Sequence, residues 1–330
     1  MRIIILIACI VPLIGWAQVG GQLGYQSLNL TSNARAAALG GTAISLADGD
    51  ISQFFENPAI LDSVGAKNIF IQINPYFADI SVYSGAYSFE VGSLGVFAAG
   101  LNYVNYGSFE MTDEFGNDIG TFQAQDYTFQ IGKAHSVGPF TLGASLKVAH
   151  SAIDTYGSTT ILMDIGGVFR IRNNWTVSMV FANMGATISD FTALESPSIP
   201  FDVKLGTSFK PQYMPLRFTI TTTNLVNENF ALEEGDGGRS NKAVDKVLKR
   251  LNFGTEVLLS KNFQLLVGYN HKRKQELRLE NIGGGAGFSY GIMVQIKRIE
   301  LRFSRATFHS AGGTSFISLR TDFNDFKKIL

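Results

Sequence analysis

From about residue 66 onward the sequence alternates apolar and polar residues in segments of roughly 8 to 13 residues. One such segment sets Phe140, Leu142, Ala144, Leu146 and Val148 against Thr141, Gly143, Ser145 and Lys147. Because side chains on a β-strand point alternately to opposite faces, this period of two places the apolar residues on one face and the polar residues on the other. The sequence therefore predicts an all-β fold.

The surroundings of that fold follow from composition. Only 16% of the 330 residues are charged, whereas ordinary soluble domains carry about 25%. After the N-terminus, no apolar run reaches the ~18–20 residues that a membrane helix needs. A closed β-barrel is the other way to cross a bilayer, because every backbone hydrogen bond is made between strands. A soluble β-sandwich also alternates, so periodicity alone leaves both architectures open.

The spacing of the segments favours the barrel. Short connections are expected near 92–93, 136–139, 172–174, 211–215, 260–262 and 297–298, and long ones near 106–120, 151–158, 184–200, 225–250, 272–285 and 308–313. Alternating tight turns and longer loops is typical of outer-membrane barrels. Counting through the connections predicts a 14-stranded antiparallel outer-membrane barrel over 66–330. Both termini would then be periplasmic and the long loops extracellular.

Charged residues on the polar faces are expected to point into the lumen, since basic side chains facing lipid would cost about 2–4 kcal/mol each at mid-membrane. These residues are Asp164, Arg170, Asp202, Lys204, Glu256, Glu300, Arg302 and Arg320. Both signs occur, which favours a cross-linked interior over an ion-selective ring. The alternative is the solvated face of a soluble sheet.

The first 17 residues have the layout of a signal peptide. Arg2 supplies the positive region, 3–14 the apolar core, and Ala17 ends the small-residue cleavage site. Cys9 is the only cysteine and lies inside this segment, so the expected mature chain has no thiol for a disulfide, for catalysis or for a metal.

Residues 18–65 are expected to form a plug, or hatch, inside the barrel. Ser32 would cap a short helix over 34–39, and two glycines would end it. Asn57-Pro58 would force an extended or turn conformation before the first strand. The motif residues are Ala34, Arg35, Leu39, Gly40, Gly41, Asn57, Pro58 and Ala59. The alternative is a subdomain lying on the surface.

We find no pattern for catalysis, for a cofactor or for a metal. The four histidines lack metal-ligand spacing. The glycine-rich run 283–287 precedes a predicted strand and not a helix, which favours a flexible loop over a nucleotide site. A net charge of zero argues against nucleic acid as a partner.

The connection 225–250 contains a predicted amphipathic helix with a basic flank. Its candidate docking residues are Lys242, Val244, Lys246, Val247, Lys249 and Arg250. Such a helix could dock a protein partner or anionic lipopolysaccharide. It could equally pack on the barrel mouth as a lid.

The stretch 28–61 resembles the start of the PorV/PorQ family, in the run Ser32-Asn33-Ala34-Arg35-Ala36-Ala37-Ala38-Leu39-Gly40-Gly41 and in Asn57-Pro58-Ala59. These are outer-membrane proteins of the type IX secretion system of Bacteroidetes, and the Asn-Pro-Ala triplet is shared with FadL-type fatty-acid transporters. The resemblance implies a non-enzymatic barrel that anchors a PorZ-like surface protein, with PorU-like and PorV-like proteins, in the complex that processes secreted cargo.

A channel for hydrophobic substrates such as long-chain fatty acids is the alternative that the FadL-type likeness implies. Such a channel would need an apolar pocket and a gap in the wall, and Gly95, Gly132, Gly166 and Gly291 are positions where strands could kink. A cargo shuttle differs from the anchor mainly in its partner. The modest loops favour the anchor.

Overall fold

The computed structural model describes residues 25–191, 198–226, 247–276, 285–309 and 312–323. Across these residues fourteen antiparallel strands close into one barrel, in which each strand pairs with its sequence neighbours and β1 pairs with β14. The strands are β1 Asn68–Pro75, β2 Ser81–Glu90, β3 Val96–Thr112, β4 Asp118–Val137, β5 Phe140–Ile153, β6 Tyr156–Arg172, β7 Trp175–Ser189, β8 Asp202–Phe209, β9 Leu216–Thr222, β10 Leu251–Val257, β11 Phe263–Asn270, β12 Phe288–Ile296, β13 Ile299–His309 and β14 Gly312–Asp322. The predicted 14-stranded antiparallel barrel is confirmed.

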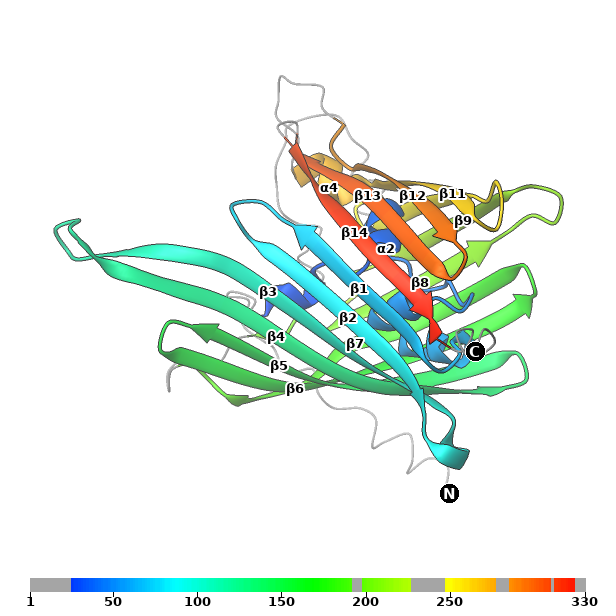
Figure 1. The fold of residues 1–330 in the computed structure, drawn as a ribbon, viewed down its shortest axis with the longest axis horizontal. Coiled ribbons are helices and arrows are strands. Elements are labelled where there is room, and N and C mark those ends of the chain that lie inside the picture. Colours follow the sequence, from blue (N-terminus) through cyan, green and yellow to red (C-terminus); the bar gives the residue numbers. More distant parts are fainter. Residues whose placement is uncertain (1–24, 192–197, 227–246, 277–284, 310–311, 324–330) are drawn as a thin grey trace, which may run out of the picture.

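The helices are few and short. They are η1 Gln26–Asn29, α2 Ala34–Ala38, η2 Ile51–Phe55, η3 Pro58–Ser63, η4 Gly92–Leu94 and α4 His271–Glu276. No helix among the described residues is long and apolar enough to span a membrane. The three elements α2, η2 and η3 precede β1 in the chain and pack against the inner wall of the barrel (Figure 1).

The outer wall carries an apolar band. On β5, every second residue from Phe140 to Val148 is exposed, and the residues between them are buried toward the lumen. That band covers nine residues, and a membrane-spanning strand needs about 9–11. Its two ends are marked by rings that stack on neighbouring strands, such as Phe140 on Phe169 at 4.4 Å and Tyr103 on Tyr127 at 4.8 Å. The band and its aromatic belts are those of a barrel that meets lipid.

The strands are uneven in length. β3 and β4 have 17 and 20 residues, whereas β9 and β10 have 7 each. The predicted long loops 106–120, 151–158 and 184–200 are largely wrong, since β3 to β7 continue through most of them (Figure 1). The β3–β4 connection shrinks to five residues because the Asp113 carboxylate accepts hydrogen bonds from the backbone N–H groups of Phe115 and Asn117. These strands therefore project far beyond the apolar band.

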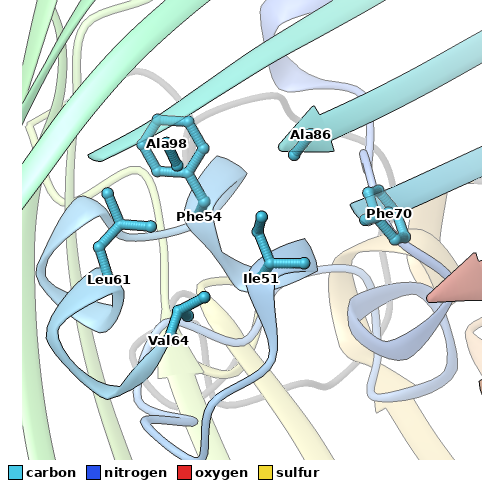
Figure 2. Packing of buried hydrophobic residues seen from close by; sticks show 7 residues of the cluster. All are labelled: Ile51, Phe54, Leu61, Val64, Phe70, Ala86 and Ala98. Carbon is cyan, nitrogen blue, oxygen red and sulfur yellow. The ribbon is translucent and has the colours of Figure 1, made fainter. Parts of the chain in front are cut away.

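Residues 25–65, called the hatch from here on, have their own apolar core. Ile51, Phe54, Leu61 and Val64 pack together and against Phe70, Ala86 and Ala98 of β1, β2 and β3 (Figure 2). This cluster joins the short helices η2 and η3 to the wall. The predicted targeting segment and the start of the hatch lie within 1–24, outside the described residues.

The first helix of the hatch begins one residue later than predicted. Its cap is Asn33 and not Ser32: the Asn33 side chain accepts a hydrogen bond from the N–H of Ala36 at 2.7 Å. Asn33 also donates to the Ser52 carbonyl, so its amide serves the helix and η2 at once, which the Ser32 hydroxyl could not do. Gly40 and Gly41 follow with φ values of 99° and 112°, as expected for residues that end a helix.

Candidate functional site: the hatch and the barrel wall

Glycines on the inner wall make room for the hatch. A Cβ atom at Gly143 of β5 would overlap the backbone of Pro58 and Ala59, and one at Gly166 of β6 would overlap the Asn57 amide. The hatch backbone therefore lies directly on the wall at these points. Wall glycines likewise adjoin Ala38, Leu39 and Gly40 across Gly254, Gly268 and Gly291, and Phe54 across Gly132.

These contacts correct the interpretation of the strand glycines as kinks. Gly132, Gly166 and Gly291 keep their partners in the β-ladder, at Ala98, Val180 and Ser304 respectively. Gly95 lies in the connection after η4, with φ 86°. The glycines thus serve the fit of the hatch and leave the ladder continuous where they stand.

Asn57 and Pro58 build the turn that leads into η3. The Asn57 side-chain oxygen accepts from the Ala59 N–H at 2.9 Å, while its amide nitrogen donates to the Ile44 carbonyl at 2.8 Å. Pro58 occupies the first position of η3, where its missing N–H does no harm. Asn57 itself is extended, as predicted for a residue before proline. The triplet therefore fixes η3 and ties it to the preceding hatch segment.

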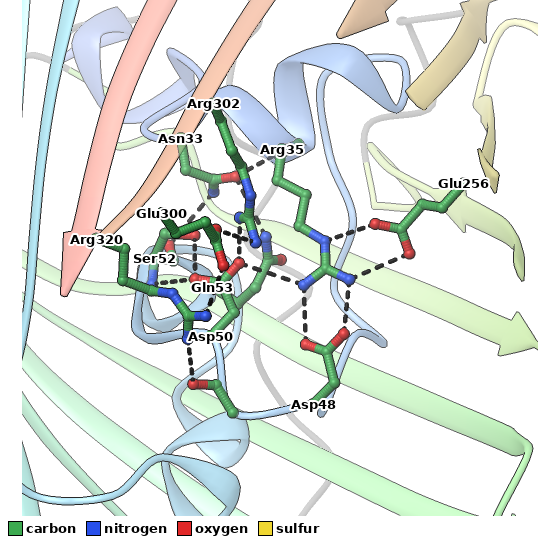
Figure 3. Close-up of polar contacts among 12 residues, drawn as sticks. Asn33, Arg35, Asp48, Asp50, Ser52, Gln53, Glu256, Glu300, Arg302 and Arg320 are labelled. Atoms are coloured by element: carbon green, nitrogen blue, oxygen red, sulfur yellow. Dashed lines mark hydrogen bonds and ion pairs between the residues drawn. The ribbon is translucent and has the colours of Figure 1, made fainter. Parts of the chain in front are cut away.

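Arg35 is the centre of a buried ion-pair network. From α2, its guanidinium contacts Glu256 of β10 at 2.7 Å and Asp48 at 2.7 Å, and it reaches Asp50 at 3.2 Å (Figure 3). Its side chain is 2% exposed and that of Glu256 is fully buried. Arg217 of β9 closes the cluster, with Asp48 at 2.6 Å and Glu256 at 2.9 Å. One hatch arginine thus joins two hatch carboxylates to the wall.

A second group of charges continues the network across β13 and β14. Asp50 pairs with Arg302, which also contacts Glu300 at 2.6 Å. Arg320 of β14 contacts Glu300 at 2.6 Å and donates to the carbonyl of Gly49 at 3.0 Å. The residues of this group cluster around the hatch loop in Figure 3. Hatch and wall therefore exchange charge contacts on β9, β10, β13 and β14.

The network is electrically balanced. Its four arginines are Arg35, Arg217, Arg302 and Arg320, and its four carboxylates are Asp48, Asp50, Glu256 and Glu300. Burial alone would favour the neutral acid, but the attraction of Arg35 and Arg217 holds the pKa of Asp48 well below its usual range. Arg302, Arg320 and Arg35 do the same for the pKa of Asp50. Both hatch carboxylates are therefore ionised at neutral pH.

Two cavities border the hatch, and both are small. One of about 40 Å³ is lined by Glu56, Lys147 and Lys204 among other residues. The other, of about 100 Å³, lies beside Asp48, Arg217 and neighbouring residues. Ligand pockets commonly measure about 300–1,000 Å³ and are mostly apolar. These two suit water-sized polar guests better than hydrophobic molecules.

The predicted docking residues are only partly within the described chain. Val247 is exposed and helical, while Arg250 carries the backbone contacts that join this segment to the end of β9. Lys249 is described too, whereas Lys242, Val244 and Lys246 lie outside the described residues. The docking role of this segment stays a prediction.

Sequence analysis had predicted that Glu256, Glu300, Arg302 and Arg320 face the lumen, and the structure places them there. It missed Arg217, although Phe218 and Ile220 point outward and Arg217 alternates with them. It also did not foresee that Asp48 and Asp50 would be the partners of these residues. Among the described residues, no group of three or more His, Cys, Asp and Glu side chains could hold a metal ion.

No protein-family model and no curated protein matches the sequence. The fold is similar to solved barrels of the FadL family. A TodX monoaromatic hydrocarbon channel mutant is 14% identical with a TM-score of 0.56, covering 88% of this chain and 99% of its own. A Pseudomonas aeruginosa FadL homologue is 12% identical with a TM-score of 0.52, covering 89% and 98%. The CymD monoaromatic hydrocarbon channel is 10% identical with a TM-score of 0.53, covering 92% and 99%.

These likenesses establish the architecture: this chain is a FadL-type 14-stranded barrel. The named neighbours are channels and not enzymes. At 10–14% identity they show the fold and leave the activity of this chain to be argued from its own residues.

Proposed function

We propose that this chain is a non-enzymatic outer-membrane barrel that anchors a surface partner of a secretion and attachment complex. The observation that carries the proposal is the occupied interior, in which the hatch is bonded to the wall by a balanced ion-pair network around Arg35. An anchor needs a stable barrel and no passage. The secretion role itself rests on the resemblance of residues 28–61 to the PorV/PorQ family.

The interior also argues against a simple hydrophobic conduit. A hydrophobic substrate is recognised by apolar surface, and charged walls raise the free energy of its entry. Here the hatch meets the wall through Arg35, Asp50 and their partners, and the two cavities beside it have charged linings. Passage would require the hatch to break these contacts.

The second candidate function is a FadL-type channel for hydrophobic small molecules. The comparisons favour this function over the anchor, because the TodX and CymD neighbours are monoaromatic hydrocarbon channels. In this chain, such a channel would open by movement of the hatch away from Gly143 and Gly268, on which its backbone lies.

The proposed arrangement follows the sequence-based prediction. The barrel sits in the outer membrane with both termini periplasmic and the β3–β4 connection outside. Its partner is a PorZ-like surface protein, with PorU-like and PorV-like proteins as further members, and its outer leaflet is lipopolysaccharide. The segment containing Lys249 and Arg250 is a proposed contact for that partner or for the lipid.

Two measurements on the same protein separate the functions. The first is affinity purification of the tagged barrel from its native membrane in mild detergent, with quantification of co-purified proteins by mass spectrometry. The second is uptake of a labelled hydrocarbon into liposomes that contain the purified barrel. A stoichiometric surface protein without uptake supports the anchor. Uptake above empty liposomes, with the barrel recovered alone, refutes the anchor and supports the channel.

A further inference from the structure

Strands β3 to β7 reach well beyond the apolar band. The 20 residues of β4 extend about 66 Å at ~3.3 Å per residue. At a tilt of ~40° this covers about 50 Å along the membrane normal, whereas the hydrocarbon core is only ~30 Å thick. About 20 Å of these strands must therefore stand outside the hydrocarbon core. We call residues 106–124, 149–161 and 183–190 the ledge.

An aromatic belt marks where the ledge begins. On the outer face, Tyr83, Tyr103 and Tyr127 stack in a row with ring centroids 5.9 and 4.8 Å apart. Tyrosines in such a row are typical of the membrane interface. Past this row, the outward residues turn polar, as in the pair Glu110 and Thr121. The ledge is therefore in water.

A bulge gives the ledge an apolar inner face. The register of β3 and β4 shifts by one residue between Asn105 and Ser108, which exchanges the two faces of β3 beyond that point. Phe109 now lies on the same side as Phe122, and the two rings stack at 5.2 Å. Tyr156 of β6, on this inner side by alternation with the buried Ser158, is 57% exposed. Apolar surface is left open above the lumen.

The ledge is strongly acidic. It carries six carboxylates and neither Lys nor Arg: Glu110, Asp113, Glu114, Asp118, Asp154 and Asp190. The whole chain has no net charge, so this one end departs sharply from the average. At its tip, Phe115 is 87% exposed beside Glu114. Exposed aromatic residues set among carboxylates are a surface for a partner with basic and apolar groups.

The two outer strands of the ledge are open edges within the described pairings. β3 pairs with β2 only as far as Asn105, and β7 pairs with β8 only as far as Ala182. Beyond these residues each strand pairs on one side. Unpaired strand edges are surfaces to which another chain can add.

We propose that the ledge is a docking surface for a folded extracellular protein domain with a basic, aromatic-accepting face. This proposal rests on the proposed function, which places the ledge outside the cell. Lipopolysaccharide is anionic and a second copy of this chain presents the same acidic surface, so charge repulsion disfavours both as occupants. A basic protein surface answers both the charge of Glu110 and Asp118 and the exposed Phe115.

The test places a photo-cross-linking amino acid at Phe115 or at Tyr156 in the native cell. The same substitution at Tyr290, which is half exposed on the outer wall of β12, is the control. The expected result is one protein adduct shared by both ledge sites, cross-linked through a segment rich in Lys and Arg, and absent at Tyr290. No protein adduct at the ledge, or an adduct to lipopolysaccharide or to a second copy, would overturn the proposal.

Charge is tested in the same strain with Glu110→Gln, Glu114→Gln and Asp118→Asn combined. Asp113 is kept because its carboxylate caps the β3–β4 turn. The adduct yield at Tyr156 is expected to fall at least tenfold, and to fall with added salt in the unsubstituted ledge. Glu90→Gln at the opposite end of the barrel should leave the yield unchanged.

The two proposals fail in different ways. A partner that co-purifies with the unaltered barrel but gives no ledge adduct overturns the ledge as the docking surface while the anchor stands. A barrel that recovers no partner in mild detergent overturns the anchor as well. An adduct yield that survives removal of the three charges overturns the electrostatic part of the docking proposal.

Discussion

Replacement of Arg35 tests directly whether the ion-pair network holds the hatch. Arg35→Met keeps most of the side-chain volume and removes contacts to Glu256, Asp48 and Asp50. Breaking a buried pair by removing one partner destabilises by about 3–5 kcal/mol. Arg217 still contacts Asp48 and Glu256, so the lower end of that range applies.

A loss of about 3 kcal/mol corresponds to a hatch-opening equilibrium raised roughly 100- to 200-fold. Hydrogen exchange at the hatch amides measures this equilibrium, since Ala37 and Gly41 donate hydrogen bonds inside the hatch and are protected only while it is folded. The strand amides of β5 should exchange as before. The heat-modifiable migration of the barrel on gels should also be unchanged.

Two further variants make the measurement decisive. Arg172→Met removes an exposed arginine near the end of β6 and should leave exchange unaltered. Arg35→Met with Glu256→Gln removes both members of one pair, and should open the hatch less than the sum of the two single changes because fewer charges stay unpaired. If Arg35→Met changed hatch exchange by less than threefold, the network would not be what holds the hatch.

Three more expectations follow from the same contacts. Gly143→Val should displace η3 by steric overlap with Pro58 and Ala59, raising protease cleavage within the hatch, whereas Gly85→Val, where no hatch atom lies close, should not. The depressed pKa values of Asp48 and Asp50 mean that their stabilising contribution is complete above about pH 4, their unfolded range. It is lost only as the pH falls further, so hatch exchange should be flat from pH 7 to 5; opening within that interval would contradict the assignment. Deleting 239–250 should leave barrel assembly intact but release the surface partner, and retention at the unaltered level would refute the docking role of that segment.

The alternation of residues predicted the barrel because lipid outside and a polar lumen inside impose opposite demands on neighbouring residues. Phe140 and Leu142 face outward and Thr141 inward for that reason, and Glu300 and Arg302 could be assigned to the lumen. The pairing of these charges could not be predicted. Arg35 and Glu256 are 221 residues apart, and a two-residue period says which face a charge occupies but not what lies opposite it.

The ledge was missed for a related reason. Polar residues such as Glu110 and Thr121 and a turn at Asp113 look like a loop in sequence, because nothing apolar is required of a strand once it leaves the membrane. The cap was missed because Ser32 and Asn33 are both good caps, and only the contact of Asn33 with Ser52 distinguishes them.

The hatch is held differently on its two sides, and this separates its stability from the proposed docking. Toward β9, β10, β13 and β14 the contacts are ion pairs, centred on Arg35 and Asp50. Toward β4, β5 and β6 they are close backbone and apolar contacts at Gly132, Gly143 and Gly166. The ledge is built from the second group of strands. Arg35→Met should therefore loosen the hatch and leave the cross-link yield at the ledge unchanged, whereas a parallel loss of both would show that the partner recognises the hatch itself.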